Sequence, residues 1–144
     1  MNGREFLDSA NRLAKGGNAA DLRSATSRAY YAAFHAVRDH FSECDVIFPK
    51  SSPDAHVKMP QCLGNCNIPQ AQSIGSRMLS LRGDRNGADY DMDDRRFEHE
   101  ANARMRIQIA AEIIASVDSL HAEPNVVAIL RPTARALGLA VRES

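Results

Sequence analysis

Four polar side chains recur at helical spacing between residues 23 and 41. Arg28, Tyr31, His35 and Arg38 are separated by three, four and three residues, which places them along one side of a helix. Arginine binds phosphate or carboxylate through paired N–H groups, and histidine exchanges protons near neutral pH. Such an edge could therefore bind an anion or assist proton transfer. A structural interpretation also fits, in which Tyr31 and His35 lie half-buried at the margin of a bundle.

A second group of polar side chains lies in the short segment 81–91. We expect this segment to form a loop between two helices, because Gly83 and Gly87 interrupt the helical pattern. Loops held by rigid helices commonly carry binding groups. An internal pair between Asp89 and an arginine is the structural alternative. The candidate binding residues of the segment are Arg82, Asn86 and Asp89, and Arg85 and Tyr90 lie among them.

The three cysteines, Cys44, Cys62 and Cys66, do not make a complete set of disulfide pairs. With His56 they could ligate zinc, but their spacing matches none of the common zinc fingers or ribbons. We therefore expect free thiols, no metal and no other cofactor. The N-terminal segment contains neither an apolar signal sequence nor a membrane span, so we expect a cytoplasmic protein without a membrane partner.

Acidic residues between positions 89 and 100 have the spacing of the ligands in a calcium-binding loop, but the segment lacks the glycine that such a loop requires. Asp89, Asp91, Asp93 and Glu100 fall at its first, third, fifth and twelfth positions. The sixth position is Asp94, where the sharp turn of such a loop requires glycine. The acidic run is better explained as the start of a helix, where negative charge is favourable.

The composition limits the fold and the partners. The 144 residues are 44% hydrophobic and 25% charged, which is typical of one folded domain. The formal net charge is zero, so a nucleic-acid site would have to be local. Fifteen of the 18 basic residues are arginines, which bind phosphate well, although codon bias explains the same ratio.

Apolar residues at helical spacing predict the elements that position these groups. A first helix extends from Gly3 to Lys15, and a second follows a cap at Asn18 or Asp21. The second helix has the clearest apolar stripe, over residues 22–41. These two helices place the polar edge described above beside a buried face.

The remaining elements are less regular. Residues 43–69 hold four of the six prolines and should form a long irregular connection, interrupted by a short helix around 54–59. A helix fits residues 70–82, and the last long helix follows the acidic run and ends before residue 124. We expect the second and last long helices to pack together, with Phe34 and Ile109 buried.

Amphipathic helices of this kind bury their stripes only by packing on one another. The predicted fold is all-α, a single-domain antiparallel bundle of four to five helices over residues 1–123. Residues 124–144 are expected to form a C-terminal tail or a short helix.

The segments RSATSRAYYAAFHAVRDHF (23–41) and RNGADYD (85–91) together resemble the two signature segments of the HEPN superfamily. The most similar branch comprises small bacterial proteins with an Arg, Ala-Tyr-Tyr-Ala, Phe, His pattern followed by Arg-x-x-Ala-Asp-Tyr. The resemblance extends from the first helix through the last long helix. It implies a HEPN-like bundle, a homodimer, and pairing with a nucleotidyltransferase antitoxin in toxin–antitoxin or phage-defence systems.

Active HEPN ribonucleases carry an arginine followed after four to six residues by a histidine, and they cut RNA across a dimer without metal. Arg85 and Asn86 match the start of that motif, but Tyr90 occupies the histidine position. Tyrosine, with an ordinary pKa of about 10, is a poor base at neutral pH. The resemblance therefore favours a module that binds single-stranded RNA, a nucleotide or the nucleotidyltransferase.

Two alternatives remain. One is a metal-independent ribonuclease toxin that uses Arg85 with Tyr90 or His35 as catalytic residues. The other is a structural dimerisation domain. In either case the two signature segments should converge, with Arg28 or His35 in contact with Asp89 or Tyr90.

Overall fold

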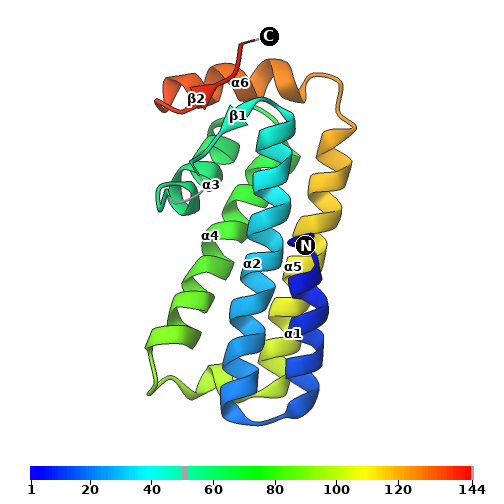
Figure 1. Ribbon diagram of the computed structural model, residues 1–144, viewed down its shortest axis with the longest axis vertical. Helices are drawn as coiled ribbons and strands as arrows, with labels where there is room; N and C mark the ends of the chain where they lie inside the picture. The colour runs from blue at the N-terminus through cyan, green and yellow to red at the C-terminus, as the bar shows by residue number, and fades with distance from the viewer. Residues whose placement is uncertain (50–51, 144) are drawn as a thin grey trace.

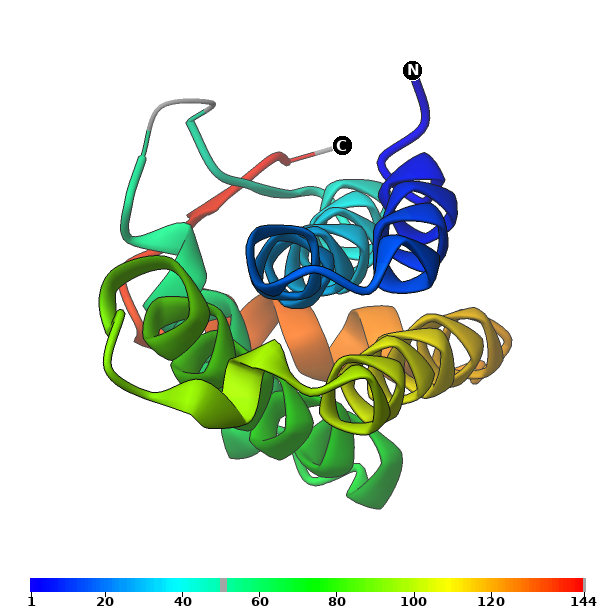
Figure 2. The same ribbon diagram turned by 90° about the horizontal axis from the view of Figure 1, so that it is seen from below.

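The computed structural model describes residues 1–49 and 52–143 and forms an all-α bundle, as predicted (Figure 1). Three long helices run along the bundle axis: α2 (Ala19–Glu43), α4 (Pro69–Tyr90) and α5 (Glu100–His121). The shorter α1 (Glu5–Gly16) lies beside α2, and Figure 2 shows these two helices stacked over α4 and α5. Consecutive long helices are antiparallel. The first signature segment (23–41) lies on α2 and the second (85–91) lies at the end of the neighbouring α4.

The α1–α2 hairpin forms at the predicted place. Gly17 ends α1 in the left-handed conformation, with φ of 75°, which glycine adopts at little cost. Asn18 then caps α2, because its Oδ1 accepts a hydrogen bond from the backbone N–H of Asp21 at 2.9 Å. Ala10 and Ala14 of α1 are fully buried in the core. These small residues allow α1 to lie close to α2.

The packing of α2 on α5 is confirmed, but one of the two predicted core residues is not fully buried. Phe34 is 4% exposed, whereas Ile109 is only half-buried and Met105 is 49% exposed. Residues four apart rotate by about 40° per step around a helix of 3.6 residues per turn. Along the row Met105, Ile109 and Ile113 the side chains therefore turn from an exposed position to a fully buried one, and Ile107 and Ala110 are buried as well.

Residues 43–69 contain more regular structure than predicted. Within the described residues, α3 (Ala55–Asn65) continues through Pro60, and β1 (Val46–Ile47) pairs antiparallel with β2 (Ala140–Val141). Pro60 removes one helical hydrogen bond. It is tolerated because the burial of Met59 and Leu63 offsets that loss. The long irregular connection is therefore corrected to a short helix with flanking turns.

The expected loop at residues 81–91 is also corrected, because α4 runs unbroken to Tyr90. A helical glycine costs only about 1 kcal/mol, and Leu81 and Ala88 bury their side chains in the same turns. At Gly87 a Cβ would lie 2.6 Å from the ring of Phe97, so glycine permits close packing. Phe97 belongs to the short 3-10 helix η1 (Arg95–Glu98) that precedes α5.

The C-terminal segment forms α6 (Val126–Ala136), which crosses one end of the bundle (Figure 1). Its Val126, Leu130 and Ala134 are buried in the same core cluster as the long helices. Within the described residues, no single helix combines the length and apolar character of a membrane span. In the described part of the chain, α5 and α6 taken together have that length and apolar character, but the pair is bent by 109°.

Candidate functional site

The two signature segments meet across α2 and α4, as predicted, although through different residues. The Nη2 of Arg85 donates a hydrogen bond to the hydroxyl of Tyr31 at 2.8 Å. Ser27 Oγ donates to Asp89 Oδ2 at 3.2 Å. Because α4 is helical here, its residues three and four apart face α2 together. The convergence therefore joins residues 27–31 of α2 to residues 85–89 of α4.

The contacts predicted for Arg28 and His35 are wrong. Within the described residues, neither side chain forms a hydrogen bond or ion pair with Asp89 or Tyr90. The guanidinium of Arg28 instead lies 5.2 Å from the centre of the Phe6 ring. The His35 ring stacks on the same Phe6 ring, with centres 5.7 Å apart. Both side chains therefore pack on Phe6 of α1.

Arg85 is held in place by its neighbours and has little freedom. Its Nη1 donates to Asn86 Oδ1 at 2.9 Å. Its Nε lies 3.0 Å from Asp89 Oδ2, an ion pair whose angle does not make a hydrogen bond. The rings of Tyr31 and Tyr90 lie on the guanidinium, with centres 5.3 Å and 5.7 Å from its carbon. Asp89 therefore balances the charge of Arg85 in this structure.

The structure adds His56, which sequence reasoning placed in a short helix of the connection and considered only as a zinc ligand. Its Nδ1 lies 2.6 Å from the hydroxyl of Tyr30, and its ring stacks on Phe34 with centres 4.2 Å apart. Burial lowers the pKa of His56, and the charges of Arg82 and Arg85 lower it further. Burial raises the pKa of Tyr30, so the phenol keeps its proton and we assign it as the donor to Nδ1. His56 is then neutral and carries its own proton on Nε2.

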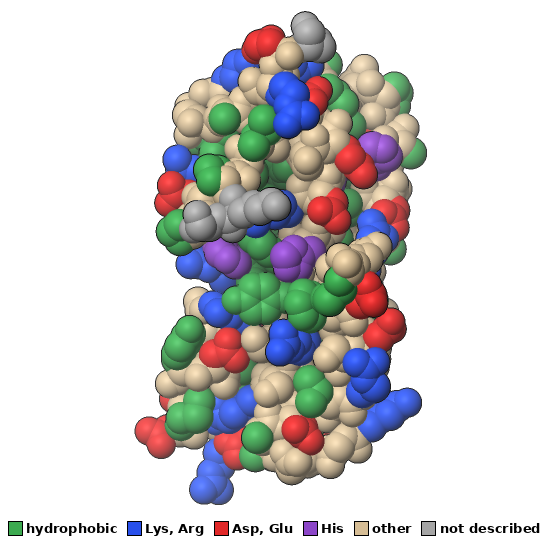
Figure 3. All heavy atoms as spheres, viewed as in Figure 1, with side chains coloured by type: hydrophobic (Ala, Val, Ile, Leu, Met, Phe, Trp, Pro, Cys, Tyr) green, Lys and Arg blue, Asp and Glu red, His purple; other side chains and the backbone are tan. Residues whose placement is uncertain are grey.

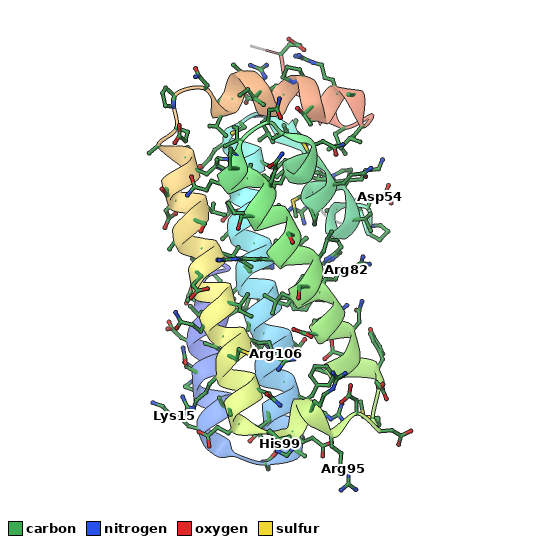
Figure 4. The ribbon with its side chains drawn as sticks, turned by 180° about the vertical axis from the view of Figure 1, so that it is seen from behind. Lys15, Asp54, Arg82, Arg95, His99 and Arg106 are labelled. Carbon is green, nitrogen blue, oxygen red and sulfur yellow. The ribbon has the colours of Figure 1, made fainter. Side chains whose placement is uncertain are left out.

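The other candidate residues lie around this cluster. Tyr90 is 74% exposed at the end of α4, and Arg82 lies on α4 level with α3 (Figure 4). Arg82 forms no hydrogen bond or ion pair within the part of the chain that is described. His35 is half-buried, and burial lowers its pKa, so it too is neutral at pH 7. The positive charge near these rings therefore comes from Arg28 and Arg82, together with Arg38, whose Nη2 already donates to the backbone carbonyls of Phe48 and Pro49.

These side chains form one surface, which we call the aromatic–arginine face. Figure 3 shows histidine, hydrophobic and basic side chains together at the middle of this side of the molecule. Its aromatic rings offer flat surfaces for stacking, and its arginines offer N–H donors for phosphate. The face consists of Phe6, Arg28, Tyr31, His35, His56 and Arg82.

Arg23 is a buried residue whose importance sequence reasoning missed. It is 8% exposed, and its guanidinium donates hydrogen bonds to five backbone carbonyls at the end of α4 and in the turn after it, and to one carboxylate. In the sequence, Arg23 is marked only by its place next to Leu22 of the apolar stripe. The acceptors, at 2.8–3.5 Å, are the carbonyls of Gly87, Ala88, Asp91, Met92 and Asp94 and the carboxylate of Glu98.

The residues weighed for zinc and calcium make other contacts. Cys44, Cys62 and Cys66 are free and buried, while His56 bonds to Tyr30. A hydrogen bond from Cys62 lowers the pKa of Cys66 to about 7 and raises that of Cys62. In the calcium-like segment, Asp94 accepts the backbone N–H of Arg96 at 3.1 Å, and so caps η1.

Comparison with known proteins gives no match to a family model, to a curated protein or to a solved structure. Function must therefore be inferred from the side chains of the aromatic–arginine face.

Proposed function

We propose that this protein binds single-stranded RNA or a nucleotide on the aromatic–arginine face, as a non-cleaving module of the HEPN type. The observation that carries the proposal is the Tyr31–Arg85 hydrogen bond of 2.8 Å. It joins the two segments that resemble HEPN signatures, and it holds the Tyr31 ring beside His35 and His56.

The chemistry of the face suits a base with an attached phosphate. Stacking of a base on an aromatic side chain contributes about 1–3 kcal/mol and depends little on sequence. Arg28 and Arg82 can supply N–H donors to phosphate, since neither is used in an ion pair within the described residues. The charge is local, which fits a protein of zero net charge.

Binding without cleavage is favoured by the state of Arg85. Its charge is balanced by Asp89 at 3.0 Å, so it is poorly placed to neutralise charge that develops on a phosphate. Tyr90 is exposed, and tyrosine is a weak base at neutral pH. The two groups expected to act as a catalytic pair therefore lack the chemistry for efficient cleavage.

The experiment is a binding titration of labelled single-stranded RNA by fluorescence anisotropy at fixed salt. We expect Arg28→Ala with Arg82→Ala to weaken binding at least about 10-fold and to reduce its salt dependence, because phosphate contacts are lost. Arg104→Ala on α5, whose side chain pairs only with Glu100, is the matched control and should leave affinity unchanged. Equal affinity of the double variant and the wild type would refute the proposal.

A metal-independent ribonuclease is the second candidate, because His56 brings an imidazole into the cluster that contains Arg85. With Nδ1 accepting from Tyr30, its Nε2–H could donate a hydrogen bond to a leaving oxygen, and transfer of a proton would require the imidazolium form of His56, which carries protons on both ring nitrogens. We expect at most weak cutting by the protein alone. Robust cutting in a chelator that is lost in Arg85→Ala and His56→Gln, but kept in His99→Gln, would favour this candidate over simple binding.

The wider setting is also a proposal and rests on the HEPN resemblance. It comprises a cytoplasmic homodimer and a nucleotidyltransferase antitoxin of a toxin–antitoxin or phage-defence system. Light scattering measures the dimer, and co-purification with a neighbouring nucleotidyltransferase tests the partner. A stable dimer that binds neither RNA nor nucleotide would support the structural dimerisation domain instead.

A further inference from the structure

A second cluster of titratable side chains lies outside the aromatic–arginine face, where the C-terminal ends of α2 and α5 meet. They surround a cavity of about 150 Å³. Two histidines and a glutamate face one another there, although His40 and His121 are 81 residues apart in the sequence. The polar residues that line the cavity are Arg4, Asp39, His40, Glu43, Asp118 and His121.

The geometry of three of these residues resembles a set of metal ligands. His40 and Glu43 are three residues apart on α2 and so project from one side of the helix. His121, the last residue of α5, lies with its Nδ1 3.2 Å from Glu43 Oε2. One ligand atom from each of the three residues lies within 4.8 Å of the others. Two ligands of a tetrahedral zinc ion are about 3.4 Å apart, so each separation has to shorten by at most about 1.4 Å to close the set.

The burial of His40 is the independent observation. Its side chain belongs to a residue that is only 2% exposed, and its Nδ1 has no hydrogen-bond partner among the described residues. The other ring nitrogen, Nε2, lies 3.8 Å from Cys44 Sγ. A buried nitrogen without a partner is costly, and most such atoms in proteins are satisfied. A metal ion bound at Nδ1 would supply the missing partner.

The charge of the cavity favours a cation. Asp39, Glu43 and Asp118 line it, against the single cation of Arg4. That cation is already used, since Arg4 forms two hydrogen bonds to Asp118 at 2.6 Å and 2.9 Å. The two remaining carboxylates leave an excess of negative charge beside neutral imidazole, the form of histidine that binds metals.

We propose that His40, Glu43 and His121 bind a divalent transition-metal ion of the zinc class. Two imidazoles and one carboxylate are a common ligand set for zinc, and they leave one position for water. The ion would join the end of α2 to the end of α5. This site is separate from the aromatic–arginine face and does not depend on the proposed function.

The experiment measures Zn²⁺ binding to the full chain by competition with a chromogenic chelator, after removal of bound metal. We expect one tight site per chain, weakened more than about 100-fold in Glu43→Gln and in His121→Asn, because each variant removes a direct ligand. Both side chains are more than half exposed, so the variants should fold, and circular dichroism checks this. Co²⁺ should give the visible absorption of tetrahedral coordination in the wild type and in neither Glu43→Gln nor His121→Asn.

Matched controls are His99→Asn and Glu123→Gln. His99 lies at the opposite end of α5 from His121 (Figure 4), and Glu123 is exposed beyond that helix. Both control variants should bind Zn²⁺ like the wild type. Absence of a tight site in the wild type would overturn the proposal. So would equal affinity in Glu43→Gln and His121→Asn, or an equal loss in the controls.

Discussion

At the scale of single residues, Arg23 shows how one buried side chain can organise a connection between helices. The last carbonyls of a helix have no partner inside it, and a cation near them is favourable. Arg23 supplies both donors and charge to the end of α4 and the turn after it. This turn places the ring of Phe97 against Gly87.

We predict that Arg23→Lys destabilises the protein by about 3 kcal/mol. Lysine has one ammonium group, which cannot reach acceptors spread over seven residues as a planar guanidinium does, and removing one member of a buried polar network leaves the others unpaired. Urea unfolding measures the change. Arg12→Lys, at an exposed position of α1, should change stability by less than about 0.5 kcal/mol.

The residues of the candidate site were predictable in part. The convergence of the two segments was predictable, because each carries polar groups that a neutral protein does not otherwise explain, but the pair that joins them, Tyr31 and Arg85, was not the pair expected. His56 could not be found in this way, since its role depends on α3, whose helix is interrupted by Pro60 in the sequence pattern. The contacts of Arg28 and His35 depend on Phe6 of α1, and helical spacing alone does not say which helix covers a polar edge.

The Phe34 ring links this cluster to the core. We predict that Phe34→Ala lowers the free energy of unfolding by about 3–5 kcal/mol, because the side chain is 4% exposed and its stacking on His56 is lost. Thermal or urea unfolding measures the loss. Leu79→Ala, at a position 50% exposed on α4, should cost less than about 1 kcal/mol. Similar losses in the two variants would contradict the assignment of Phe34 to the core.

At the scale of helices, periodicity predicts α1, α2 and α5 well, because their apolar stripes are long. It fails where glycine or proline lies inside a helix, as in α3 and α4. These residues have a packing role that only the neighbouring helix reveals. Gly75 is the clearest case, since a Cβ there would lie 2.7 Å from the carbonyl oxygen of Pro60. The proline and the glycine thus belong to one helix–helix contact.

Two glycines of α4 give a matched prediction. Gly75→Ala should destabilise the protein by roughly 1–3 kcal/mol, because the new methyl group meets backbone that cannot move aside easily. At Gly83 the same change meets nothing within 4 Å, so it should stabilise the helix by up to about 1 kcal/mol. Chemical denaturation of both variants provides the measurement. Equal effects at the two positions would mean that α3 does not pack on α4 as described.

At the scale of the whole molecule, the C-terminal segment with α6 and β2 completes the core at one end of the bundle. α6 buries Leu130, and β2 pairs with β1, so segments almost a hundred residues apart are fixed at one end of the bundle. Burial at this scale also governs protonation. His35, His40 and His56 lie on or near α2, and burial is the largest cause that lowers the pKa of each. All three rings are therefore held neutral by the fold.

We predict that the metal-free protein loses stability as the pH falls below about 6.5. In that range the unfolded chain binds protons at these histidines and the folded chain does not, so protons favour unfolding. A fully buried histidine contributes up to about 1.4 kcal/mol per pH unit. Urea unfolding from pH 7.5 to 5 in chelator measures the slope, before the ion-paired Asp118 begins to titrate. His56→Gln should flatten the slope, whereas His99→Gln, at an exposed position, should keep it. A free energy of unfolding that stays constant down to pH 5 would contradict the prediction, because it would mean that these histidines bind protons equally well in the folded and the unfolded protein.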